Sequence, residues 1–288
     1  SKAALPPNPY RGLDVFRKEH KENFFGRTTE IAELKQLVEQ HRLVAVIGAS
    51  GSGKSSLVLA GLVPALEATG NWVISEGRPK TQPFEGLAAA FVSLLYQDPL
   101  DQAKKLKSFA SELNSGEVDL PHLLPLLQAK FPEKRFLLII DQFEEIFTLT
   151  TDSQLQHRFL DRLLEGVQAE LPLTLRADFM GQVLAYAPLA TALDRHAKKL
   201  LSAMDTKGLR EAIEAPAKRL GVSLETGLTQ LILDDVGQEP GNLPLLEFAL
   251  TELWEKQQYG DLTHAAYEEI GGVQLALARY ADKVYKAF

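Results

Sequence analysis

The sequence contains no cysteine at any of its 288 positions. This absence excludes disulfide bonds, thiolate zinc sites and a cysteine nucleophile, and it suits a reducing compartment, so we expect a cytoplasmic protein. No run of about 18 consecutive apolar residues is present, so no membrane-spanning segment is expected. No signal peptide is visible either. Because the chain begins at Ser1 rather than Met, we expect it to be a fragment of a longer protein.

An excess of positive charge is also missing. The chain has 31 Lys and Arg residues against 38 Asp and Glu, which gives a net charge of −7. General nucleic-acid and membrane-surface binders carry basic patches, so both classes are disfavoured. The six histidines are scattered without the paired spacing of a metal centre. The share of hydrophobic residues, 45%, is ordinary for a globular protein of one large or two to three small domains.

A phosphate-binding loop is the strongest motif. Residues 48–55 match the pattern G-x-x-x-x-G-K-[ST], between an apolar β-branched run at 43–47 and a helical stretch from 56. A flexible Gly/Ser linker would not have apolar runs on both sides. Backbone amides of such a loop wrap phosphates, Lys54 is expected to reach the β- and γ-phosphates, and Ser55 is expected to bind Mg²⁺. The candidate nucleotide-binding residues here are Gly48, Ala49, Ser50, Gly51, Ser52, Gly53, Lys54, Ser55 and Ser56.

A second nucleotide motif follows about 90 residues later. The apolar run 136–140 ends in Asp141, the arrangement in which a strand-end carboxylate holds Mg²⁺, usually through water. Two acids follow, and additional-strand ATPases place the base that orients the attacking water at this point. We expect Glu145 to be that base, with Glu144 as the second choice. Alternatively, these acids only stabilise a helix N-terminus.

The next predicted strand, at 171–175, ends in Arg176. In additional-strand ATPases this strand lies between the two motif strands, so Arg176 would face the γ-phosphate and stabilise charge there. An ion pair between Arg176 and Asp178 at a helix start is the alternative.

The alternation of strands and helices predicts an α/β fold, with strands also at 72–75 and 198–204. We therefore expect a P-loop NTPase of the additional-strand (AAA+-like) class, with a five-stranded parallel sheet flanked by helices. The pattern becomes all helical after about residue 205. The expected domains are an N-terminal arm at 1–22, a nucleotide-binding domain at 23–204, a helical lid at 205–260, and the start of a winged-helix or further helical segment at 261–288.

With these motifs the chain resembles the STAND class of signalling NTPases, specifically the bacterial "novel STAND NTPase 1" group that often occurs next to WD40 repeats. The DQFEE and RADF stretches are the most specific matches. All matching stretches are residues 8–13, 24–27, 48–56, 60–62, 141–145, 175–179, 240–246 and 271–273.

The resemblance implies further nucleotide contacts. It places Phe25, Gly26 and Arg27 against the adenine, and it places Pro244 of the lid over the nucleotide. The segment Gly241-Asn242-Leu243-Pro244 has one residue more than the family's Gly-x-Pro pattern. Ordinary core packing of Phe25 and a helix-start role for Pro244 remain open.

The resemblance also implies a function, namely a switch that binds ATP or ADP with Mg²⁺ and hydrolyses ATP slowly. ADP would keep the switch closed, and exchange for ATP would permit homo-oligomerisation and activation of an effector, in bacterial defence against phage or in cell death. The effector and repeat-sensor domains would lie outside this sequence. The alternatives are a P-loop kinase, a remodelling motor and a DNA-loading ATPase, although the acidic composition disfavours nucleic acid as a partner.

Overall fold

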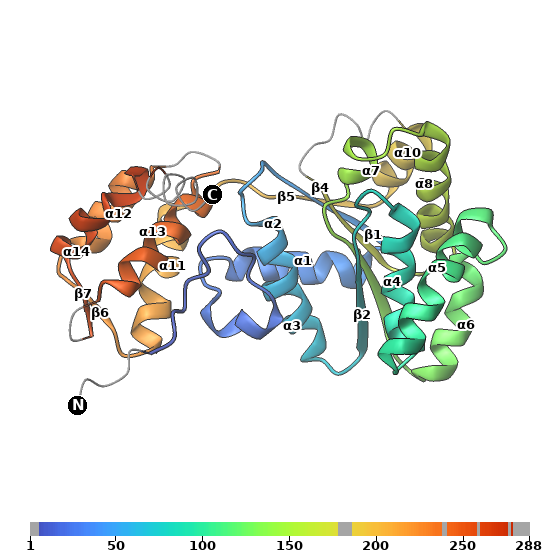
Figure 1. Cartoon of the computed structure of the whole chain (residues 1–288), viewed down its shortest axis with the longest axis horizontal. Helices are drawn as coiled ribbons and strands as arrows, with labels where there is room; N and C mark the ends of the chain where they lie inside the picture. Colours follow the sequence, from blue (N-terminus) through green and yellow to red (C-terminus); the bar gives the residue numbers. More distant parts are fainter. Residues whose placement is uncertain (1–5, 178–185, 238–240, 258–259, 276–277, 279–288) are drawn as a thin grey trace. The chain divides into compact units, whose positions relative to one another are not determined.

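The computed structural model describes residues 6–177, 186–237, 241–257, 260–275 and 278 (Figure 1). Its internal contacts divide the chain into two compact units, which are described separately. The sheet unit comprises Ala32–Gly48 and Ala65–Leu201. The lid unit comprises Ser1–Ile31, Ala49–Pro64 and Ser202–Phe288, so it contains the phosphate loop as well as the C-terminal helices. Helices α1 (Thr28–Gln40) and α3 (Val63–Glu67) have residues in both units.

The sheet unit is built on five parallel strands in the order β2-β3-β4-β1-β5. β4 pairs with both β1 and β3, which confirms the additional strand expected between the two motif strands. Pro172 has no N–H to give to a ladder, so β4 begins one residue after it. The strands are β1 (Leu43–Ile47), β2 (Trp72–Gly77), β3 (Arg135–Ile140), β4 (Leu173–Ala177) and β5 (Ala197–Leu200).

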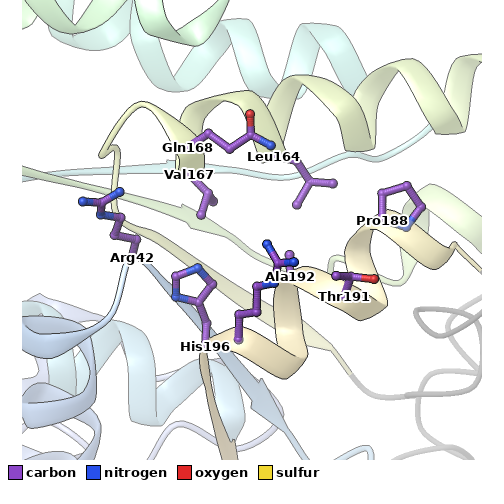
Figure 2. Close-up of a pocket in the computed structure, with 9 residues that line it drawn as sticks. Arg42, Leu164, Val167, Gln168, Pro188, Thr191, Ala192 and His196 are labelled. Carbon is purple, nitrogen blue, oxygen red and sulfur yellow. The ribbon is translucent and has the colours of Figure 1, made fainter.

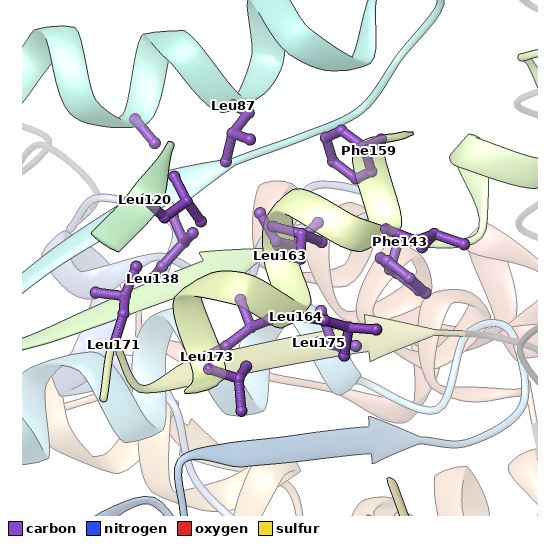
Figure 3. Close-up of a cluster of buried hydrophobic side chains, with 14 of the residues drawn as sticks. Leu87, Leu120, Leu138, Phe143, Phe159, Leu163, Leu164, Leu171, Leu173 and Leu175 are labelled. Carbon is purple, nitrogen blue, oxygen red and sulfur yellow. The ribbon is translucent and has the colours of Figure 1, made fainter. Parts of the chain in front are cut away.

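Helices cover one face of this sheet and enclose the main core (Figure 3). Alternate strand residues, such as Leu138 and Leu173, point into this core, because successive side chains of a strand lie on opposite faces. Helix α8 contributes Phe159 and Leu163 to it. These helices are α4 (Pro83–Leu95), α5 (Pro99–Ser115), α6 (Leu120–Lys130) and α8 (Ser153–Gln168), with the shorter α7 (Glu145–Thr148) and α10 (Ala187–Arg195) beside them.

The lid unit has its own core, formed by α11 (Thr206–Arg219), α12 (Leu228–Val236), α13 (Leu243–Glu255) and α14 (His264–Ile270). The two-residue strands β6 (Ser223–Leu224) and β7 (Asp261–Leu262) pair in parallel between these helices. Helical periodicity does not predict them, because two residues are too few to show a strand period. Within the described part of the chain, no helix combines the length and the apolar character that crossing a bilayer requires.

The helix after the phosphate loop changes its winding. It starts as α2 (Lys54–Ser56), continues as the π-helical segment η2 (Leu57–Leu62) and ends as α3. The Val63 N–H bonds to the carbonyl of Val58, five residues back. Pro64 lacks the N–H that an α-helix would donate to Ala60, so the wider π turn lies where a proline kink is expected.

The N-terminal segment is part of the lid core. Tyr10 is buried, its ring meets Trp254 edge-to-face at a centroid distance of 5.9 Å, and its hydroxyl donates to the Ile213 carbonyl at 2.5 Å. The Trp254 indole N–H donates to the carbonyl of Pro6 at 3.1 Å, and the Asn8 amide donates to the carbonyl of Thr251 at 3.2 Å. These contacts fix the segment on α11 and α13, and the short 3₁₀ helix η1 (Lys18–Asn23) follows it.

We expect Tyr10→Phe to lower the free energy of unfolding by about 1 kcal/mol, because it removes one buried hydrogen bond and keeps the ring. Tyr186→Phe is the matched control, since its hydroxyl bonds to Asp161 at an exposed position. Urea unfolding of both variants measures the difference. Equal effects at the two positions would contradict a structural role of the Tyr10 hydroxyl.

Candidate functional site

The phosphate loop has the geometry of an anion cradle. Gly51 and Gly53 adopt positive φ angles of 74° and 87°, which residues with a Cβ rarely adopt. The buried Lys54 donates from Nζ to the Ala49 carbonyl at 2.7 Å. The Ser52 hydroxyl is buried and has no hydrogen-bond partner among the described residues. A buried ammonium and an unsatisfied buried hydroxyl on one loop fit a phosphate group.

The lid helix α13 begins against this loop. A Cβ built on Gly51 would lie 3.1 Å from the Gly241 Cα and 3.2 Å from the Pro244 Cγ. On Gly53 it would lie 3.6 Å from the Leu243 Cδ1. Pro244 is the second residue of α13, so it starts a helix and also packs on the phosphate loop. Its contact with a nucleotide stays a prediction, and Pro240 of the same motif lies outside the described residues.

Arg27 is hydrogen-bonded to the backbone of the phosphate loop. Its side chain is 3% exposed, and Nη2 donates to the Ser52 carbonyl at 3.2 Å and to the Ser202 carbonyl at 3.1 Å. Nη1 pairs with Glu30 at 2.6 Å. These bonds tie the loop to the start of the segment that leads into α11. The predicted adenine contact of Arg27 remains a prediction.

The other predicted residues of this unit have distinct surroundings. The Ser56 hydroxyl accepts the Phe16 N–H at 3.2 Å, so it anchors the N-terminal segment. Gly26, with φ of 83°, lies directly against the Gly208 carbonyl of α11. Phe25 is half-buried. Ser55 is half-buried and has no side-chain partner within the part of the chain that the structure describes, which leaves its hydroxyl available to a metal ion.

In the sheet unit, Asp141 and Arg176 form a buried ion pair. Their side chains are 10% and 6% exposed, and Arg176 Nε donates to Asp141 Oδ1. The Arg176 Nη2 atom is buried and unpaired within the described residues. An unpaired guanidinium N–H at a strand end is suited to an additional anion. Asp178, the alternative partner of Arg176, lies outside the described residues.

Glu145 is held by a residue that the sequence did not single out. Its carboxylate accepts Arg78 Nε at 2.9 Å and also Arg78 Nη2, and it accepts the Lys80 N–H at 3.0 Å. Burial raises the pKa of Glu145, but the Arg78 and Lys80 hydrogen bonds and the charge of Arg78 outweigh burial and lower that pKa below its usual value. The position of Arg78 in the sequence could have indicated this contact. Arg78 directly follows β2, and β2 pairs in parallel with β3, so Arg78 and Glu145 both follow strands that end at the carboxyl edge of the sheet.

The turn between Asp141 and Glu145 has an unusual backbone. Gln142 has a φ of 48°, in the left-handed region that non-glycine residues rarely enter. Phe143 is completely buried, and its N–H donates to the Arg176 carbonyl at 2.9 Å. The buried ring and this hydrogen bond fix the backbone of the turn, and therefore the backbone positions of Glu144 and Glu145.

A family model, Novel STAND NTPase 1, matches residues 9–288. The chain belongs to the Novel STAND NTPase 1 family. This membership confirms the expected STAND class of P-loop NTPases. No curated protein matches the chain.

Solved structures share the fold of this Novel STAND NTPase 1 chain at low sequence identity. The Walker-type ATPase PABY2304 of Pyrococcus abyssi is 14% identical, with a TM-score of 0.57 over 95% of this chain and 76% of its own. Domain III of the Thermotoga maritima replication initiation protein DnaA is 14% identical, with a TM-score of 0.53 over 97% and 98%. The Aeropyrum pernix Orc1 protein, solved with DNA, is 14% identical, with a TM-score of 0.54 over 91% and 70%. Together with the strand order, these likenesses show an AAA+-like P-loop NTPase fold.

Proposed function

We propose that this chain is the nucleotide-operated switch of a STAND NTPase, which binds ATP or ADP with Mg²⁺ and hydrolyses ATP slowly. The observation that carries the proposal is the contact between the phosphate loop and the start of the lid helix α13, at Gly51 and Pro244. Lys54 and the loop amides bind the phosphates, and Ser55 and Asp141 hold Mg²⁺. Among the described residues no cluster of three or more metal-ligating side chains exists, so water and phosphate oxygens would complete the Mg²⁺ shell.

The packing supports a switch because the phosphate loop would bind the nucleotide and also contacts the start of α13. A ligand shifts a conformational equilibrium only by its difference in affinity for the two states. A phosphate that orders residues 49–55 also changes the surface on which Gly241 and Pro244 rest. A γ-phosphate adds charge that Lys54 and Arg176 can recognise. ATP and ADP would therefore favour different positions of the lid helices, and through them control homo-oligomerisation and an effector outside this sequence.

Slow hydrolysis is supported by the bonds of Glu145. A general base needs a free lone pair within reach of the attacking water. Here the carboxylate already accepts three N–H groups from Arg78 and Lys80. Release from Arg78 would then precede catalysis by Glu145.

Glu145→Gln is expected to keep nucleotide binding and to slow hydrolysis by about 100-fold or more, since it removes the base and keeps the shape. Glu144→Gln is the matched control at the neighbouring acid. Phosphate release and calorimetry with ATP, measured on both variants, separate chemistry from binding. If Glu144→Gln slows hydrolysis and Glu145→Gln does not, the assignment of the base is wrong.

The proposal as a whole is tested by the nucleotide that the purified protein retains, identified by chromatography after denaturation. Tightly held ADP and a turnover well below 1 s⁻¹ are expected for the switch. Turnover above about 1 s⁻¹, in the usual enzyme range, would favour a motor instead.

A DNA-loading ATPase is the second candidate, favoured by the similarity to the DNA-bound Orc1 structure. The net charge of −7 argues against it. Binding of duplex DNA that weakens steeply with salt would support it over the signalling switch.

A further inference from the structure

A cavity of about 460 Å³ lies between α8 and α10 in the sheet unit (Figure 2). Arg42 immediately precedes β1 and His196 immediately precedes β5, so the cavity is at the amino edge of the sheet. Asp141 and Arg176 lie at the carboxyl edge of the same sheet. The cavity is therefore separate from these predicted nucleotide residues, and nothing in the proposed switch uses it.

One side of the cavity is cationic although the chain as a whole is acidic. Arg42, Arg195 and His196 line it. The side chains of Arg195 and His196 have no hydrogen-bond or ion-pair partner within the described part of the chain. Arg42 pairs with Glu170 at 2.5 Å, but these two side chains are 49% and 73% exposed, and such surface pairs are weak.

The pKa of His196 is lowered from its usual value, partly by the positive charges around it. Burial lowers the pKa of His196, and the positive charges of His41, Arg42 and Arg195 lower it further. A ring whose protonation is opposed by neighbouring cations marks a site where an anion would be stabilised.

The opposite wall of the cavity is apolar. Leu164 and Val167 of α8 line it, with Gln168 at its end, and Figure 2 shows Leu164 and Val167 across the cavity from His196. Ala192 of α10 adds an apolar side chain near His196. We infer that this cavity binds a small organic anion, with a phosphate or carboxylate head at Arg42, Arg195 and His196 and an apolar body against Leu164 and Val167. Mostly apolar walls with a few converging polar groups are the usual composition of a small-molecule site.

Calorimetric titration of the Lys54→Ala protein with phenyl phosphate and phenylacetate tests the site. This background keeps the probes out of the phosphate loop, so the result does not depend on whether the chain binds nucleotides. Inorganic phosphate supplies the head alone and phenol the body alone. We expect phenyl phosphate or phenylacetate to bind at least tenfold more tightly than inorganic phosphate or phenol. Whichever of the two binds more tightly shows whether the site prefers a phosphate or a carboxylate head. Absence of saturable binding, or equal binding of the parts, would overturn the inference.

Paired substitutions locate the binding. Arg42→Gln with Arg195→Gln should weaken the tighter probe at least tenfold, whereas Lys104→Gln with Lys105→Gln, which removes two exposed charges from α5, should not. Ala192→Phe fills the cavity without changing its charge, so it should also weaken binding of the tighter probe. In NMR titrations, bound probe should raise the pKa of His196. The arginines could instead only neutralise the carboxyl ends of α8 and α10; a lower melting temperature with unchanged probe affinity would show this and refute the site.

Discussion

Lys54→Ala is expected to abolish detectable binding of ATP and to weaken the binding of ADP. The ammonium is buried and donates to the Ala49 carbonyl within the loop, so a phosphate oxygen would meet a donor that is already desolvated and positioned. Hydrogen bonds to charged groups contribute about 1.5–3 kcal/mol each. For ATP, loss of two such bonds, to the β- and γ-phosphates, corresponds to a loss of affinity of about 100-fold or more. ADP loses only the bond to its β-phosphate, which corresponds to about tenfold or more.

Calorimetry with each nucleotide measures this effect, with Lys105→Ala as the control for removing one exposed lysine. The melting temperature without nucleotide should change little, because Lys54 belongs to neither of the two hydrophobic cores and the substitution leaves both intact. Unchanged affinity in Lys54→Ala would remove the central claim about the loop. Loss of affinity together with a large fall in melting temperature would show that Lys54 mainly supports the fold.

The fold was predictable from the sequence where the signal is local. The central strands β1, β3 and β4 are short, mainly apolar runs, and the motif at 48–55 predicts the loop that joins β1 to the following helix. The edge strand β5 has two lysines among its four residues and carries no such signal. The position of β4 between β1 and β3 was expected from the additional-strand class of ATPases that the motifs indicate, and the strand order confirms it. Boundaries were less accurate at β5, which ends at Leu200 rather than continuing to 204.

The site was predictable only in part, because several of its contacts join residues far apart in sequence. Arg78 and Glu145 form a hydrogen bond because the strands before them, β2 and β3, pair in the sheet. No sequence motif at either residue predicts the other as its partner. The same holds for Tyr10 and Ile213, which are 203 positions apart. Composition predicted an N-terminal arm at residues 1–22, and only the tertiary structure shows that Pro6, Asn8 and Tyr10 of this segment contact α11 and α13.

Gly26→Ala is expected to destabilise the fold strongly. A Cβ at this position would lie 2.3 Å from the Gly208 carbonyl oxygen and 2.9 Å from its carbon, and both groups are backbone that cannot rotate away. The φ of 83° adds strain for any residue with a side chain. Strain of about 1–3 kcal/mol and overpacking of about 1–3 kcal/mol together approach the whole stability of a marginal domain.

Gly221→Ala is the matched control, because its φ of 74° is similar and nothing lies within 4 Å of its added Cβ. It should cost about 1–3 kcal/mol from backbone strain alone. Urea unfolding of the two variants therefore separates strain from the clash with α11. If Gly26→Ala is no less stable than Gly221→Ala but loses nucleotide affinity, Gly26 acts through the adenine contact that the family resemblance implies. If Gly26→Ala lowers the free energy of unfolding more than Gly221→Ala does, the close approach of Gly26 to Gly208 is the reason that glycine is required at position 26.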